Sequence, residues 1–554
     1  MDQEQESSKK SPRSRKEIAV HLADFEKHLE RRLSQRDASA ALGVPRSTLR
    51  HWKNRKDSIP IAQSVIECLE SPDGTDFLHL LIVTLEFVMI QVAGCGIRLV
   101  ALVLTLTHLN NFVAGSYESL RRRSLELENN INTYGEKERH RRSEAMSNKK
   151  ISVAEDETFH PQTCLVAIEP ASNFILLEKY SEKRDAASWN AEMDEALSGL
   201  NVEVIQSTSD EAKGIVNHAE KHLVAHHSPD IFHVQHDISK GCSASLALKT
   251  RHAQKEFDQA VDNLKSLESA EQQAAALKQP HVEAEQQKII AEARVAECKK
   301  QEGIIEGARQ GIGHDYHPYD LKSGRARDPD QLENSLNKRF DLIEKTVKNN
   351  DLRESAVQKV EKARRVIPGL VKTLTFYWAM INVLLESVAL TAPLNRIMKE
   401  ILIPAEYLFL ASKKGKGSAS RKEIYHVATG LIGKLENEKE WLQLDQSEKD
   451  HLKKIAKEGA SYFQRSSSCV EGRNGYLSLR RHGLHRLSNR KLSALTVIHN
   501  YFIKRPDGST AADRFFGGQG SDLFEYLLEK MPYPGRSGQR AKLLRCQPPI
   551  SETV

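Results

Sequence analysis

Residues 148–237 carry a strand pattern within a chain whose other segments have helical periodicity. Three short runs rich in Val, Ile, Leu and Phe are separated by turn residues, namely KKISVAEDETF, QTCLVAIE and NFILLEKY. They are followed by an amphipathic helix (DAASWNAEMDEALSGL), a fourth strand (NVEVIQST), a second helix (SDEAKGIVNHAEKHLVA) and a fifth strand (PDIFHVQHD). The predicted order is three antiparallel strands, helix, strand, helix, strand. This order indicates an α/β fold with a sheet of five strands.

The composition is that of a soluble folded protein. The seven cysteines are odd in number and lack paired spacings such as C-x-x-C, which indicates free thiols in a reducing compartment. No secretory signal is expected, because the N-terminus has no apolar run after its charges.

The apolar run 78–109 contains Glu86 and Arg98, each costing roughly 2.5 to 3.5 kcal/mol inside a bilayer, and Gly94 and Gly96 interrupt it. We therefore expect two core helices joined by a glycine turn rather than a membrane hairpin.

Two basic segments lie at opposite ends of an otherwise acidic chain. Residues 1–56 hold 14 Lys and Arg against 8 Asp and Glu, and residues 465–505 hold 9 against 1. The net charge of the whole chain is only +6, so the positive charge is local. Phosphate backbones attract such patches, although solvated faces also produce them. The single acid of the second segment is Glu471, whose isolation needs a reason.

The first basic segment contains DASAALGVPRSTLRHWKNRK, which is a helix of small residues, a turn at Gly43 and a second helix opened by Pro45. This is a helix-turn-helix signature, in which glycine permits the sharp turn and the second helix offers its first residues to the major groove. An ordinary helical hairpin with a basic end is the alternative. The residues predicted to contact DNA are Arg46, Ser47, Thr48, Arg50 and Lys53.

The strand order resembles the RNase H-like fold, which implies a mixed five-stranded sheet, and acids lie where that fold keeps its metal ligands. Asp156 is at the end of the first predicted strand, and Asp210 follows the fourth. The triplet Asp156-Glu157-Thr158 is similar to the first-strand signature of bacterial insertion-sequence transposases of the Asp-Asp-Glu (DDE) superfamily. In those enzymes a third acid lies on a late helix inside a basic segment, which is the position of Glu471. The resemblance implies that Asp156, Asp210 and Glu471 are catalytic and bind metal.

The implied chemistry is Mg²⁺-dependent phosphodiester cleavage and transfer. Two Mg²⁺ ions roughly 4 Å apart can activate the nucleophile and stabilise the leaving oxygen, and Mg²⁺ prefers oxygen ligands. Asp156 would bridge both ions, with Asp210 and Glu471 each completing one, and Mn²⁺ is able to substitute. The cations around Glu471 favour its ionised form and would follow the DNA backbone. The predicted phosphate contacts are Arg465, Arg473, Arg480, Arg481 and Arg486.

Other acids and histidines remain alternatives. Acids one residue from a candidate are Glu155, Glu157 and Glu211, and strand alternation separates Glu155 from the face of Asp156. Alternatives for the second acid are Asp230 and Asp237, around the fifth predicted strand. The histidines 226, 227, 233 and 236 and the loop 314–317 could suggest zinc, but they lack cysteine support, so we expect structural or DNA-proximal roles. The Walker spacing is absent from GKGSAS at 415–420, so no ATP requirement is expected.

The length of 554 residues predicts two to four domains, one of them interrupted by another. We divide the chain into a helix-turn-helix domain (1–60), a helical region and linker (61–147), a first part of an RNase H-like core (148–245), an all-helical insertion with a coiled-coil hairpin (246–460), the last part of the core (461–530) and a disordered tail (531–554).

The function implied by the resemblance is that of a DNA transposase. It would bind terminal inverted repeats, cut them in the presence of Mg²⁺ and join the freed 3′ hydroxyl to target DNA. The expected partners are these two DNAs and a second copy of the chain, since two DNA ends are paired, and the expected location is a bacterial cytoplasm, at the nucleoid. A non-catalytic helix-turn-helix regulator derived from a transposase, or an RNase H-like nuclease, is the alternative.

Overall fold

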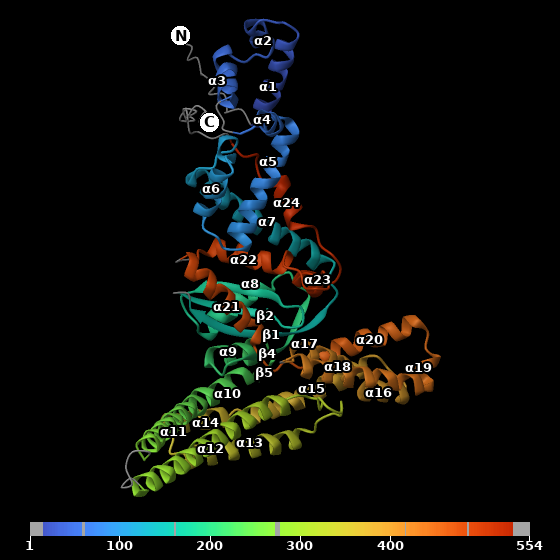
Figure 1. Cartoon of the computed structure of the whole chain (residues 1–554). Coiled ribbons are helices and arrows are strands. Elements are labelled where there is room, and N and C mark those ends of the chain that lie inside the picture. The colour runs from blue at the N-terminus through green and yellow to red at the C-terminus, as the bar shows by residue number, and fades with distance from the viewer. Residues whose placement is uncertain are drawn as a thin grey trace.

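A five-stranded mixed sheet lies near the middle of the molecule, between an N-terminal group of helices and a long helical arm (Figure 1). The computed structural model describes residues 15–57, 61–159, 162–271, 278–415, 417–484 and 487–535. Most of these residues are helical, so the fold is mixed α/β with one sheet. Most of the tail predicted to be disordered, 531–554, falls outside the described residues, which end at Gly535.

The sheet has the strand order β3-β2-β1-β4-β5. β1 pairs antiparallel with β2, and β2 with β3, whereas β1 pairs parallel with β4, and β4 with β5. The predicted mixed five-stranded sheet is therefore confirmed, and the first four strands fall on the runs that the apolar pattern indicated. Their bounds are β1 (Lys149–Phe159), β2 (Thr163–Glu169), β3 (Phe174–Ser181), β4 (Val202–Ser209) and β5 (His226–Pro229).

The prediction of a fifth strand in PDIFHVQHD was wrong. Only Pro229 of this run belongs to β5, and the rest forms helix α10 (Ile231–Ile238). Asp230 starts the helix, because its side chain accepts a hydrogen bond from the backbone N–H of Phe232. Ile231, Val234 and Ile238 then follow at helical spacing and are buried. The preceding predicted helix is also shorter than expected, consisting of α9 (Lys213–Asn217) and η3 (His218–His222).

Both faces of the sheet are covered by helices, which explains why β1 is apolar on both sides. On one face, Ala154 and Val166 pack with Val470 and Leu477 of α21 (Ser468–Leu484). On the other, Val153 packs in a core that includes α7 (Tyr117–Glu144), α8 (Ala186–Leu197) and α22 (Asn489–Tyr501). The sheet therefore supports α21 directly on the face that carries Ala154 and, by alternation, Asp156.

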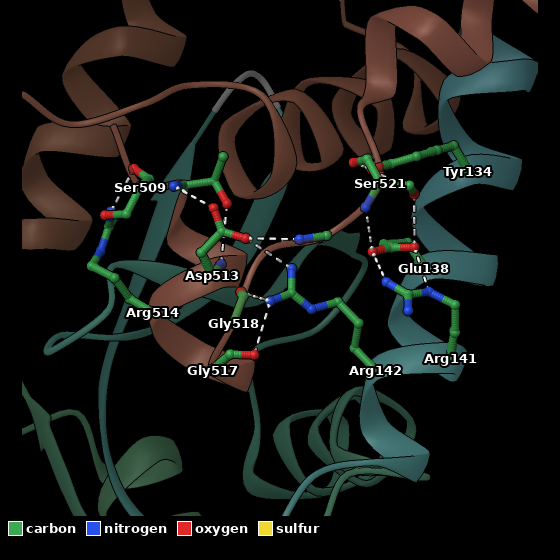
Figure 2. Close-up of polar contacts among 12 residues, drawn as sticks. Tyr134, Glu138, Arg141, Arg142, Ser509, Asp513, Arg514, Gly517, Gly518 and Ser521 are labelled. Carbon is green, nitrogen blue, oxygen red and sulfur yellow. Dashed lines mark hydrogen bonds and ion pairs between the residues drawn. The ribbon is translucent and has the colours of Figure 1, made fainter. Parts of the chain in front are cut away.

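The C-terminal segment returns to α7 and is fixed there by charged contacts (Figure 2). Arg142 donates hydrogen bonds to Asp513 Oδ1 at 3.2 Å and to the carbonyl oxygen of Gly518 at 2.6 Å. Glu138 accepts hydrogen bonds from the N–H and Oγ of Ser521 at 3.2 and 3.0 Å. Gly518 has φ +76°, a conformation that favours glycine. α23 (Ala511–Phe516) and α24 (Leu523–Lys530) are thereby held against the helix that enters the sheet.

The N-terminal helices form a small core of their own. Phe25, Ala38, Val44 and Leu49 are buried together, and Gly43 makes the turn with φ +58°. The helices are α1 (Arg15–Glu30), α2 (Gln35–Ala41) and α3 (Arg46–Asp57), followed by α4 (Gln63–Glu70).

The two predicted core helices joined by a glycine turn are present. They are α5 (Pro72–Leu85), continued by η1 (Glu86–Val92), and α6 (Ile97–Leu106), and Gly94 in the turn has φ +75°. By length and composition alone, Pro72–Val92 and Glu354–Ser387 could each cross a membrane. Core helices of soluble proteins pass the same test, and Glu86 is fully buried in an ion pair with Arg123 at 3.1 Å. These helices are consistent with a soluble protein.

The described chain between α10 and α21 forms helices joined by turns and loops, with an isolated bridge between Tyr319 and Ala326. It begins with η4 (Ser239–Ser243) and with α11 (Ala244–Glu271) and α12 (Lys278–Asp315), which form the elongated pair in Figure 1. The remaining helices are α13 (Pro329–Asn349), α14 (Glu354–Arg364), α15 (Ile367–Ser387), α16 (Ala392–Ile397), η6 (Met398–Leu402), α17 (Ile403–Lys414), α18 (Ser418–Gly433), η7 (Lys434–Asn437), α19 (Lys439–Gln443) and α20 (Gln446–Ser461).

The core of this helical insertion is continuous with one end of the sheet. It includes Ile205 of β4 and the buried face of α10. Thr373 of α15 also shares hydrogen bonds with His226 at 3.0 Å and Ser228 at 2.7 Å, both on β5. The insertion therefore fixes the position of α10 relative to the sheet.

Gly135 in the middle of α7 allows α22 to pack closely. A Cβ at this position would lie 2.4 Å from Cγ2 of Val497. We predict that Gly135→Ala lowers the free energy of unfolding by about 1–3 kcal/mol, although alanine is the better helix former. Urea denaturation followed by circular dichroism measures this change.

Gly303→Ala in α12 is the matched control, because nothing lies within 4 Å of its Cβ position. It should raise stability by up to about 1 kcal/mol. A stabilising effect of both substitutions would contradict the close packing of α7 and α22.

Candidate metal centre

Three aspartates lie at the carboxyl ends of the three parallel strands. Asp156 is near the end of β1, Asp210 directly follows β4, and Asp230 directly follows β5. Ala154 on β1 pairs with Thr208 on β4, which in turn pairs with Ser228 on β5. Each aspartate lies two residues after one of these paired residues, so the three occupy equivalent positions on neighbouring strands. Carboxyl ends of parallel strands are where ligands bind in open α/β sheets. The sheet thus directs three carboxylates to one edge.

Glu471 joins this edge from a distant part of the sequence. It lies in the first turn of α21, and the neighbouring Val470 is buried against the sheet. Ligand atoms of Asp156, Glu471 and His233 all lie within 4.8 Å of one another. His233, on α10, has its Nε2 4.0 Å from Glu471 Oε1 and 3.7 Å from Asp230 Oδ2. The site therefore combines the end of β1 with α10 and α21.

The electrostatics of the site are dominated by the burial of Asp156. The residue is only about a tenth exposed, and burial raises its pKa from 3.8 to about 7, with the Glu471 and Asp210 carboxylates adding to the rise. Asp156 accepts hydrogen bonds from the N–H of Glu157 at 2.8 Å and from Nδ2 of Asn474 at 3.3 Å. Within the described part of the chain, no Lys or Arg forms an ion pair with Asp156 or Glu471.

These residues fit a divalent cation. Two ligands of one such ion, each about 2.1 Å from it, lie about 3 to 4 Å apart, which is close to the spacing within this cluster. A cation would supply the positive charge that the two carboxylates lack, and carboxylates are ligands that Mg²⁺ and Mn²⁺ accept. Asp210 lies outside the 4.8 Å cluster, but it is near enough to affect the pKa of Asp156.

The acids one residue away do not belong to the cluster. Glu155 is buried on the opposite face, where it accepts a hydrogen bond from Ser207 Oγ and lies 3.5 Å from His218 Nε2. Glu157 accepts hydrogen bonds from Arg184 at 3.2 Å and Trp189 at 3.3 Å. Two further alternatives also lie apart, since Glu211 is exposed and Asp237 pairs with Lys362.

Asp230 is the remaining alternative for the second acid, and it borders the site. It is fully buried, and its oxygens accept hydrogen bonds from the N–H of Phe232 and from Ser467 Oγ. It is therefore already engaged as the helix cap of α10, whereas Asp210 remains partly exposed.

Three arginines predicted to contact phosphate are engaged inside the protein. Arg473 is buried and donates two hydrogen bonds to Glu178, at 2.7 and 2.6 Å. Arg480 is buried and donates to the carbonyl oxygens of Gln91 and Val92 at the end of η1. The guanidinium of Arg465 donates to the carbonyl oxygens at positions 313 and 316, at 2.6 and 3.2 Å. These positions do not agree with the predicted DNA contacts, because a guanidinium paired within the protein is not free for phosphate.

The remaining predicted DNA contacts are placed differently. Arg486 lies outside the described residues, and the structure describes only the helical backbone of Arg481. On α3, Arg46, Ser47 and Arg50 are exposed, and Thr48 and Lys53 are partly exposed.

His233 lies in the site, although the sequence predicted only a structural or DNA-proximal role for it. The histidines considered for zinc separate in the structure: His226 stacks on Phe376, and His227 lies 3.0 Å from Ser209 Oγ. His317 forms a hydrogen bond with Tyr407 in the core of the insertion. Only the helical spacing of apolar residues after Asp230 could have indicated that His233 lies one turn into a helix.

Comparisons with known proteins give one partial match. A family model described as "Family of unknown function (DUF6399)" matches residues 398–543, which include Glu471 but not Asp156. No curated protein and no solved structure matches the chain.

The raised pKa of Asp156 predicts a stability change in metal-free buffer. Because the pKa is higher in the folded state, ionisation of Asp156 costs stability, and this cost grows as the pH rises from about 4 through about 7. Asp156→Asn should therefore raise the free energy of unfolding at pH 8 by roughly 2–4 kcal/mol. The gain should shrink towards zero near pH 4. Urea denaturation in EDTA at several pH values measures it.

Glu211→Gln is the control, because this exposed acid adjoins Asp210 but lies outside the cluster. It should show no such gain. If Asp156→Asn left the free energy of unfolding unchanged, or raised it equally at pH 5 and pH 8, the result would contradict the buried position of the carboxylate.

Proposed function

We propose that this protein is a DNA transposase of the RNase H-like, Asp-Asp-Glu class. The observation that carries the proposal is the meeting of Asp156 and Glu471, more than 300 residues apart in sequence, at the carboxyl ends of parallel strands. The strand order β3-β2-β1-β4-β5, with three antiparallel and then parallel strands, resembles the RNase H-like fold. An acid in β1, another after β4 and a third on a late helix match the order of that class.

The acidic cluster supports phosphodiester chemistry in particular. Divalent cations held there would activate the nucleophile and stabilise the charge at the scissile phosphate. Asp156 lies centrally and is buried, so it would be the shared ligand, while Glu471 and the partly exposed Asp210 approach from different elements. Asn474 donates its side-chain N–H to Asp156 and fixes the orientation of that carboxylate.

The N-terminal helices support a role in reading DNA. Leu49 packs inside the small core and Trp52 packs against it, which leaves the side of α3 with Arg46, Arg50 and Lys53 facing outward. These three residues follow helical spacing, so they lie on one face. A helix-turn-helix presents such a face to the major groove, and positive charge draws it to the backbone. We assign this face to the terminal inverted repeats of the element.

We predict that the full-length protein nicks plasmid DNA carrying the sequences that flank its coding region, when Mg²⁺ or Mn²⁺ is present. Glu471→Gln should retain binding to this DNA and reduce cleavage by about 100-fold or more, because the cluster loses a charged ligand. Glu211→Gln should cleave normally. Gel assays of nicking, and of joining to a second labelled DNA, measure both steps.

Each outcome selects one function. Cleavage by Glu471→Gln at the normal rate would remove Glu471 from the site. Binding without cleavage by the wild-type protein would indicate a DNA-binding regulator, and cleavage without joining would indicate a nuclease. Arg46→Ala combined with Arg50→Ala should abolish selective binding of the flanking DNA, which tests the assignment of α3 separately.

A further inference from the structure

We infer that His233 is a nitrogen ligand of the metal centre, which gives the site a preference for Mn²⁺ over Mg²⁺. The inference rests on the metal centre of the proposed function and adds a ligand that the Asp-Asp-Glu pattern does not contain. Three observations carry it: the position of the imidazole, its lack of a competing partner, and the contacts that hold α10 against α21.

The imidazole of His233 is directed at the carboxylates. Its Nε2 lies 3.7 Å from Asp230 Oδ2 and 4.0 Å from Glu471 Oε1, and it falls within the same 4.8 Å cluster as Asp156. These separations are longer than a hydrogen bond but suit two atoms that share one cation. A ligand oxygen of Asp156 lies within 4.8 Å of both the imidazole nitrogen and the Glu471 carboxylate.

The Nε2 atom is buried and has no hydrogen-bond partner among the described residues. A buried polar atom normally has one, so an unpaired nitrogen facing carboxylates needs an explanation. The ring also packs edge-on against Phe232, with ring centroids 5.6 Å apart. A cation bound between Nε2 and the carboxylates of Asp156 and Glu471 would give the nitrogen a partner and would offset the negative charge of both acids.

Two contacts hold His233 and Glu471 in a fixed relation. The segment that leads into α21 meets the start of α10, where the N–H of Ile231 donates to the carbonyl oxygen of Arg465 at 3.1 Å. Ser467 Oγ donates to Asp230, the cap of α10. Ile231 and Val234 are anchored in the core of the helical insertion. The insertion thus presents the histidine, and α21 presents the glutamate, to the same point.

The chemistry of the donors gives the expected metal preference. Mg²⁺ favours oxygen ligands in a near-ideal octahedron and keeps several waters, whereas Mn²⁺ accepts carboxylates and, as a first-row transition metal, also binds at sites that contain nitrogen ligands. A site of Asp156, Glu471 and His233 should therefore bind Mn²⁺ more tightly than a site of carboxylates alone. Removal of the imidazole should weaken Mn²⁺ binding and leave the weaker Mg²⁺ binding nearly unchanged.

The test is Mn²⁺ binding to the full-length protein, followed by pulsed electron paramagnetic resonance. Wild-type protein should show ¹⁴N modulation from a bound imidazole, and uniform labelling with ¹⁵N-histidine should change it. His233→Gln should remove the nitrogen signal and weaken Mn²⁺ binding by about tenfold or more, with less than about threefold change for Mg²⁺ in competition. His233 is about one-third exposed, so this substitution leaves the core intact, and circular dichroism checks it.

His236→Gln is the matched control, since His236 lies on the same helix, stacks on Phe232 and is not in the cluster. It should leave both the nitrogen signal and the affinity unchanged. Mn²⁺ binding that requires Asp156 but shows no nitrogen signal, or a signal that persists in His233→Gln, would overturn the inference and leave the proposed function standing. Wild-type protein that binds neither ion, or an Asp156→Asn variant that binds Mn²⁺ normally, would overturn the metal centre itself.

Discussion

The close approach of the buried Asp156 carboxylate to Glu471 is the constraint on which the site depends. Two acids separated by more than 300 residues meet at a sheet edge where no Lys or Arg of the described chain pairs with them. Such an arrangement costs stability, and burial and the neighbouring acids raise the pKa of Asp156 to about 7. Proteins retain costs of this kind mainly at functional sites. A divalent cation is the simplest species that would turn this repulsion into attraction.

Basic side chains in the last third of the chain form ion pairs that hold the helices around the site in place. Arg473 pairs with Glu178 on β3, and both groups are buried, so loss of either partner would leave an uncompensated charge. Arg490 and Lys491 pair with Glu128 on α7, at 3.0 and 3.3 Å. Together these pairs fix α21 and α22 on the sheet and on α7. The density of positive charge in this part of the sequence thus reflects, in large part, how α21 and α22 are attached.

The helical insertion contributes to the same geometry. Its core includes one end of the sheet and the buried side of α10, so the placement of His233 depends on residues more than 100 positions downstream, such as Thr373 and the insertion helix that carries it. A long insertion at this point in the chain therefore has a structural consequence for the site. It orients the residues that follow β5.

Much of the sheet could be predicted from sequence, but the site only in part. The first four strands are seven residues or longer and each contains a short apolar run, which periodicity identifies, whereas β5 has only four residues and runs directly into a helix. Asp156 and Glu471 could be chosen because the strand pattern, the isolated acid in a basic segment and a family resemblance all indicated them. Arg473 and Arg480 could not be placed correctly, because sequence gives their charge but not their burial. His233 depends on the direction of α10 and on a contact with Glu471, which no local pattern contains.

The most direct measurement of the central claim is anomalous X-ray diffraction at the manganese edge, from crystals of the full-length protein grown with Mn²⁺. The account predicts a strong anomalous peak within bonding distance of carboxylate oxygens of both Asp156 and Glu471. A well-ordered site without a peak, or with the two carboxylates directed apart, would contradict it.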